Sequence, residues 1–98
     1  MPEQSIGLMS LNQNEREELR SMLAVPAADW QFEAMCSLAA AIGLDTFSKS
    51  SLIRKHNQSC FQCAAAQFAA WRNAPGGREL RMKEREIYYY GYPAEQSE

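Results

Sequence analysis

Apolar side chains recur at helical spacing between Phe32 and Ile42 and cover more than one face of the helix that they would form. A helix with one apolar stripe lies at a surface, whereas a helix that is apolar on most sides is buried. Asp29 is a suitable N-cap before this segment, and Gly43 suits the position just after its end. The segment therefore predicts a central buried helix around which a small helical domain packs.

The chain before this helix predicts a polar arm and one further helix. Residues 1–10 are small or polar and show no periodicity, so we expect a flexible N-terminal arm. Asn12 and Glu15 have the spacing of a capping box, which is typical of a helix N-terminus. Pro26 would end that helix, because the residue before a proline avoids the α region.

The chain after Gly43 predicts a connector and a short helix. We interpret Leu44–Phe47 as a connector without regular structure. Ser48 or Ser50 is expected to cap a short helix that ends at Asn57.

The C-terminal part predicts two more helices separated by a strong turn. Ser59 and Gln62 form a second capping-box pair, and the helix that they open would run through Trp71. The sequence Asn-Ala-Pro-Gly-Gly at residues 73–77 breaks it, and a last helix covers residues 78–90. The predicted fold is all-α, a small bundle of about five helices over residues 11–92 with a C-terminal tail at residues 93–98.

Composition sets limits on the class of protein. The 98 residues suffice for one small domain, and the net charge of −2 gives no reason to expect a nucleic-acid partner. The N-terminus shows neither the basic nor the apolar region of a signal peptide. The longest mostly apolar stretch, residues 35–44, is too short to span a bilayer, so we expect a cytoplasmic protein.

The chain has three cysteines, Cys36, Cys60 and Cys63. An odd number of cysteines argues against a complete disulfide framework. Together with His56 they are a four-residue candidate for zinc, but Cys60 and Cys63 stand at helical spacing rather than in a knuckle-like turn. We therefore expect small buried cysteines, with a metal or redox role for Cys60 and Cys63 as the alternative, and we expect no metal and no cofactor.

Several stretches resemble one family in order and spacing. The sequence has Val-Pro at residues 25–26, Gln-Phe-Glu-Ala-Met at residues 31–35 and an aliphatic-glycine pair at residues 42–43. Further matches are Phe47–Asn57, Ala64–Trp71 and the glycine turn at residues 73–77. These segments resemble the C-terminal helical lobe of phage-type lysozymes, the muramidases of phages and prophages. The resemblance implies that fold and a phage or prophage origin.

Departures from the family pattern affect the expected activity. The family's catalytic glutamate and its aspartate and threonine partners belong to an N-terminal lobe, and no such pattern precedes Ser10. Ala41 replaces an amide residue that faces the sugar cleft in the family. The family's loop after the glycine turn is missing, so the connection to the last helix is shorter here. The resemblance therefore implies a lobe without the catalytic carboxylate.

The carboxylates of this chain do not form a catalytic pair by themselves. Glycosidic cleavage needs two carboxyl groups on either side of the scissile bond. Glu84 and Glu86 are two residues apart on a helix and do not face each other, and most acids fall on helix faces expected to be exposed. His56 is interpreted as a partly buried or capping histidine. We predict no catalytic residues and no muramidase activity from this chain alone.

Tyrosines and arginines near the C-terminus form the candidate binding surface. Three consecutive tyrosines on a helix cannot all face one core, so at least one is exposed. Tyr and Arg are enriched at binding hot spots. The predicted partner-binding residues are Arg78, Arg81, Arg85, Tyr88, Tyr89 and Tyr92. The alternative is a tyrosine-rich turn that covers the docking face of the other lobe.

Three functional hypotheses follow. The first is a non-catalytic phage accessory protein that binds a host or phage protein, regulating lysis or blocking a host factor. The second is a peptidoglycan-binding half of a split or truncated muramidase. The third is a prophage remnant without a selected function. Self-association is expected where a lobe needs new cover for its exposed side.

Overall fold

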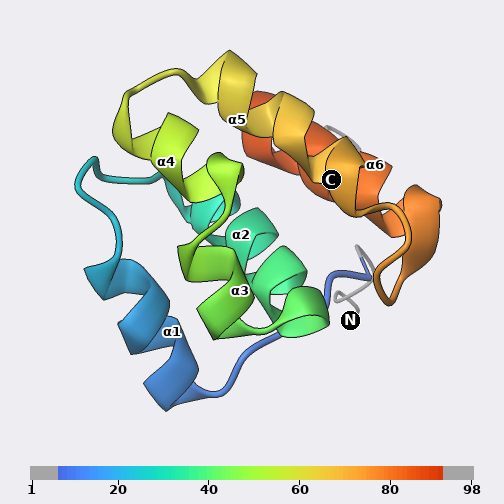
Figure 1. Ribbon diagram of the computed structural model, residues 1–98, viewed down its shortest axis with the longest axis horizontal. Coiled ribbons are helices and arrows are strands. Elements are labelled where there is room, and N and C mark those ends of the chain that lie inside the picture. Colours follow the sequence, from blue (N-terminus) through green and yellow to red (C-terminus); the bar gives the residue numbers. More distant parts are fainter. Residues whose placement is uncertain (1–6, 92–98) are drawn as a thin grey trace, which may run out of the picture.

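A computed structural model describes residues 7–91, which form α-helices joined by short loops together with one 3-10 helix and no strand (Figure 1). The elements are α1 (Gln13–Ser21), α2 (Asp29–Ile42), α3 (Leu44–Ser48), α4 (Ser51–Asn57), α5 (Phe61–Gln67), η2 (Phe68–Trp71) and α6 (Gly77–Tyr90). The all-α prediction is confirmed, with six α-helices in the described range instead of about five. None of these helices combines the length and apolar character that crossing a membrane requires.

Helix α2 lies at the centre, as its apolar pattern predicts. Seven of its residues are buried: Phe32, Ala34, Met35, Cys36, Ser37, Leu38 and Ala39. It packs most extensively against α6, which runs beside α5 and η2 at one side of the molecule (Figure 1). The predicted N-cap is wrong by one residue, because Ala28 is the N-cap and Asp29 is the first helical residue. The Gln31 side chain accepts the backbone N–H of Ala28 at 2.9 Å and so supplies the missing cap interaction.

Helix α1 begins at the predicted capping box and docks through one buried side chain and one ion pair. The Asn12 side chain accepts the Glu15 backbone N–H at 2.8 Å, and the Glu15 carboxylate accepts that of Asn12 at 3.1 Å. Leu19 is fully buried. The Arg16 guanidinium donates to both carboxylate oxygens of Glu33, at 3.1 and 2.6 Å, and so joins α1 to α2.

The connector predicted at Leu44–Phe47 is instead the short helix α3. Gly43 ends α2 with φ at +94°, a conformation that favours glycine, and the chain turns directly into the next helix. Phe47 is fully buried, so core packing stabilises a segment too short to be recognised by periodicity. Ser50 caps α4, as predicted, and its hydroxyl accepts the backbone N–H of Ile53 at 3.4 Å.

The predicted capping box at Ser59 and Gln62 is wrong. Ser59 adopts a left-handed conformation with φ at +65°, and Cys60 is the N-cap of α5 without a side-chain cap hydrogen bond. The left-handed residue therefore lies two positions before the first helical residue, Phe61. The predicted single helix through Trp71 is also divided, because its last turn tightens into the 3-10 helix η2.

The cysteines fall into two groups. Cys36 is buried and free, as expected of a small apolar residue. Cys60 and Cys63 are half-buried and form a disulfide, so the prediction that they are simply buried thiols is wrong. The two residues lie one helical turn apart, with their Cα atoms separated by 5.2 Å.

His56 and Asn57, at the end of α4, fasten the loop between α1 and α2. His56 is fully buried, more deeply than the partly buried or capping position predicted for it. Its Nε2 lies 2.9 Å from the carbonyl oxygen of Val25. The Asn57 amide accepts the backbone N–H of Ala24 at 2.8 Å and donates to the Met22 carbonyl at 3.0 Å. The two side chains thus satisfy backbone groups of a loop that has no regular structure of its own.

Residues 7–10, assigned to the N-terminal arm, contact the helical core. Leu8 packs against it, and the Met9 backbone N–H donates to the hydroxyl of Ser37 at 3.0 Å. The boundary between the arm and the helical domain at residue 10 stays a prediction. Most of the arm and the tail at residues 93–98 lie outside the described residues.

Candidate functional site

Helix α6 has two chemically different faces. Arg81, Glu84, Ile87 and Tyr88 are buried against the remainder of the bundle. Arg78, Met82, Arg85 and Tyr89 are exposed. These four follow one another at i, i+4, i+7 and i+11, a spacing that places them along a single face of a helix. The exposed face therefore alternates cationic and large apolar or aromatic side chains.

The buried face is organised by an ion pair between Arg81 and Glu84. Arg81 Nε donates to Glu84 Oε1 at 2.6 Å, and Arg81 Nη2 donates to Glu84 Oε2 at 2.7 Å. The Ser37 hydroxyl donates to Glu84 Oε2 and joins this pair to α2. Burial raises the pKa of Glu84, while the hydrogen bonds from Arg81 and Ser37 act in the opposite direction. Both carboxylate oxygens are thus occupied by donors of the protein itself.

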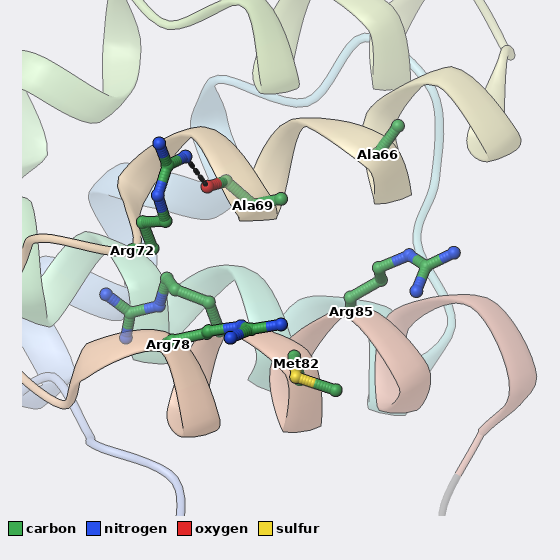
Figure 2. Close-up of a pocket in the computed structure, with 7 residues that line it drawn as sticks. Ala66, Ala69, Arg72, Arg78, Met82 and Arg85 are labelled. Atoms are coloured by element: carbon green, nitrogen blue, oxygen red, sulfur yellow. Dashed lines mark hydrogen bonds between the residues drawn. The ribbon is translucent and has the colours of Figure 1, made fainter.

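A groove between the exposed faces of α5, η2 and α6 is the candidate site, and we call it the arginine groove. Its lining residues are Ala66, Ala69, Arg72, Arg78, Arg81, Met82 and Arg85, and its cavity volume is about 430 Å³. In Figure 2, Ala66, Ala69 and Arg72 come from one wall, and Arg78, Met82 and Arg85 come from the other. Four of the seven lining residues are arginines and none is acidic. The groove therefore attracts anions.

A smaller depression adjoins the arginine groove towards the C-terminal end of α6. It has a cavity volume of about 180 Å³ and is lined by Gln62, Ala65, Ala66, Arg85, Tyr89 and Tyr90. Ala66 and Arg85 line both hollows. Tyr90 is 77% exposed and Tyr89 is 44% exposed. One continuous surface thus carries guanidinium groups at one end and tyrosine rings at the other.

The residues predicted to bind a partner are distributed over three locations. Arg78, Arg85 and Tyr89 are exposed and lie along the two hollows. Arg81 is 1% exposed and Tyr88 is fully buried, so these two side chains do not contribute an exposed contact surface. Tyr92 lies outside the described residues. The expectation that at least one of the three consecutive tyrosines is exposed is confirmed by Tyr89 and Tyr90.

Sequence reasoning missed Arg72 and Met82, which complete the arginine groove. Met82 is on the same helical face as Arg78 and Arg85, so the spacing within α6 points to it. Arg72 belongs to the other wall, and only the packing of η2 against α6 brings it into the groove. The short turn at Pro75 and Gly76 predicts that the helices on either side of it pack as antiparallel neighbours.

Residues 7–91 contain one fully buried carboxylate and no candidate metal cluster. Glu84 is the buried carboxylate, and the other described acids are exposed or half-buried, as in the ion pair of Glu33 with Arg16. Most acids were expected on exposed helix faces, and Glu84 is an exception, because Arg81 pairs with its charge and Ser37 donates a hydrogen bond to it in the core. Within this range no cluster of three or more His, Cys, Asp or Glu side chains could hold a metal ion. His56 and the cysteines are not brought together as zinc ligands.

The match to a known family covers most of the chain. The sequence model of the family described as phage lysozyme matches residues 7–86. The match includes α1 to η2 and most of α6, and therefore both walls of the arginine groove. It also includes the segments in which the sequence resembles the phage-type lysozymes.

Two curated relatives are endolysins of phages. The endolysin of Acyrthosiphon pisum secondary endosymbiont phage 1 is 36% identical over 79 residues, which are 71% of this chain and 54% of that protein. The endolysin of Salmonella phage P22 is 30% identical over 76 residues, which are 74% of this chain and 52% of that protein. The chain thus spans about half the length of the curated relatives that it matches. With this match and this helical fold, the chain belongs to the phage lysozyme family.

Proposed function

We propose that residues 7–91 act as a non-catalytic binding unit of the phage lysozyme type, and that the ligand is peptidoglycan. The observation that carries this proposal is the arginine groove, a hollow with four arginines and no acid among its lining residues. A groove of this kind suits a ligand with several negative charges, because guanidinium groups bind carboxylates in a two-pronged geometry.

Family membership supports peptidoglycan as the ligand. Both curated relatives are named endolysins. Peptidoglycan carries free carboxylates on its stem peptides, and its sugars offer apolar faces that stack on tyrosine rings. The exposed rings of Tyr89 and Tyr90 adjoin the arginine groove and provide such a surface.

The state of the carboxylates supports a non-catalytic role for the described residues. A glycosidase acid must reach the glycosidic oxygen and must have a second carboxylate opposite it. Glu84 has the raised pKa that is typical of a general acid, but it is fully buried and both of its oxygens accept hydrogen bonds. It is therefore interpreted as a structural group of the core.

A protein partner is the second candidate, and the exposed end of α6 favours it. Arg85, Tyr89 and Tyr90 line one depression, and Arg and Tyr are typical anchors of protein interfaces. Such a partner would be a host or phage protein with an acidic surface, bound to regulate lysis or to block a host factor. For this second candidate we also propose a cytoplasmic location and self-association.

Co-sedimentation with purified sacculi tests the proposal. The protein is mixed with sacculi free of bound proteins, and the bound fraction is compared with that on chitin beads, which carry the acetylated sugar without stem peptides. We expect saturable binding to sacculi and little binding to chitin. Absence of binding to sacculi, together with capture of one acidic host or phage protein through Arg85 and Tyr89, would favour the second candidate.

A further inference from the structure

Arg81 leaves one of its hydrogen-bond donors without a partner. Its Nε and Nη2 donate to Glu84, but Nη1 is buried and has no acceptor among the described residues. A buried donor without an acceptor costs about 1–3 kcal/mol. Arg81 also lines the arginine groove, but its side chain is only 1% exposed, so a ligand in the groove pairs with the exposed arginines rather than with this buried donor.

The other three arginines of the groove supply its uncompensated positive charge. Arg72, Arg78 and Arg85 are exposed, and none of them forms an ion pair with a described carboxylate. Arg72 Nη1 donates to the carbonyl oxygen of Ala69 at 3.4 Å (Figure 2). The charge of Arg81 is neutralised by Glu84, so Arg81 adds no net positive charge to the groove.

The arrangement of the arginines fits a ligand with more than one negative group. Arg78 and Arg85 are seven residues apart on one helix, which is a rise of about 10 Å along its axis. Met82 lies between them on α6, and Ala66 and Ala69 line the opposite wall. A ligand in this groove therefore meets a cationic group at each end and a small apolar surface in the middle.

We propose that the arginine groove is a carboxylate-binding site that recognises the stem peptides of peptidoglycan. One carboxylate pairs with Arg72 or Arg78 at one end of the groove, and a second carboxylate pairs with Arg85. The apolar centre accommodates the short side chains of a stem peptide. The carboxylate is the chemical group that is recognised, and its assignment to peptidoglycan rests on the proposed function.

The test measures the binding of a soluble muramyl peptide with free carboxylates by isothermal titration calorimetry. The probe is compared with the same peptide after its carboxylates have been converted to amides. Removing one charge-assisted contact at Arg78 or Arg85 is expected to weaken binding about tenfold in R78A and in R85A. K83A is the matched control, because Lys83 is an exposed cation of the same helix that does not line the groove.

Substitution of Arg81 itself is avoided, because it would leave Glu84 buried without a partner. A conservative variant provides a further measurement. R85K keeps the positive charge but loses the planar fork, and we expect its affinity to fall between those of the wild type and R85A. Sacculi whose carboxylates have been amidated should lose most of their capacity to sediment the wild-type protein.

The outcomes separate this inference from the proposed function. If R78A and R85A bind both sacculi and the muramyl peptide like K83A, the groove assignment is wrong while peptidoglycan binding stands. If the protein binds the free peptide through these arginines but does not sediment with sacculi, the carboxylate site stands and the proposed function fails. If neither ligand binds, or if the amidated peptide binds equally well, the inference is overturned.

Discussion

His56 and Tyr88 are hydrogen-bonded inside the core, with 2.6 Å between the imidazole Nδ1 and the phenol oxygen. His56 Nε2 faces the carbonyl oxygen of Val25 and must therefore carry the proton. Nδ1 is then the acceptor, and the Tyr88 hydroxyl donates to it. Through this pair α4 is joined both to α6 and to the loop between α1 and α2, so one buried contact links three parts of the bundle.

Replacing Tyr88 with phenylalanine should destabilise the fold. Y88F leaves His56 Nδ1 buried without a donor, and we expect the free energy of unfolding to fall by about 1–3 kcal/mol in urea denaturation. Y90F is the matched control, because Tyr90 is 77% exposed and should lose almost nothing. Equal stabilities of Y88F and Y90F would show that the hydrogen bond seen here contributes little.

The stability of the protein should decrease in mildly acidic solution because of His56. Burial lowers the pKa of His56 below its ordinary value of 6.5. The unfolded chain therefore takes up a proton as the pH falls below about 6.5, while the folded protein resists it, and the free energy of unfolding decreases. Urea denaturation between about pH 7.5 and about pH 5 should show a steeper loss for the wild type than for H56L. Parallel pH profiles of the two proteins would contradict a neutral buried histidine.

Removing the charge of Glu84 should be the most damaging of the substitutions considered. E84Q leaves the Arg81 guanidinium buried without its carboxylate, and breaking a buried pair in this way costs about 3–5 kcal/mol. E86Q, an exposed neighbour on the same helix, serves as the control. Thermal denaturation followed by circular dichroism checks the difference. A native-like melting temperature for E84Q would mean that the pair is dispensable.

The helices were predictable where local sequence decides the structure. The apolar pattern of α2, the capping box of Asn12 and Glu15 and the cap at Ser50 depend on residues within one or two turns. The short helix at Leu44–Ser48 was not recognised, because it is stabilised by the burial of Phe47 rather than by its own periodicity.

The candidate site was predictable only in part, since it depends on contacts between distant residues. Arg78, Arg85 and Tyr89 follow from the pattern of one helix. The burial of Arg81 depends on Glu84, whose other partner Ser37 is 47 residues away in the sequence. Arg72 reaches the groove only because η2 packs on α6. Single-helix patterns therefore locate the exposed face but not the wall opposite it.

The cysteines should differ in reactivity. Burial raises the pKa of the Cys36 thiol to about 12, so the native protein should not react with a thiol reagent such as Ellman's reagent. Cys60 and Cys63 are disulfide-bonded and do not react either. After denaturation without a reductant we expect one reactive thiol in each chain, and none in C36A. Three reactive thiols under these conditions would show that the Cys60–Cys63 bond is absent.

The most direct test of the central claim measures binding and cleavage in the same sample. Purified protein is incubated with sacculi, the bound fraction is determined by sedimentation, and the supernatant is assayed for newly released reducing sugar ends. A non-catalytic peptidoglycan-binding unit predicts saturable binding with no release above the level of the protein-free control. Release of reducing ends, or failure to sediment with the sacculi, would contradict that account.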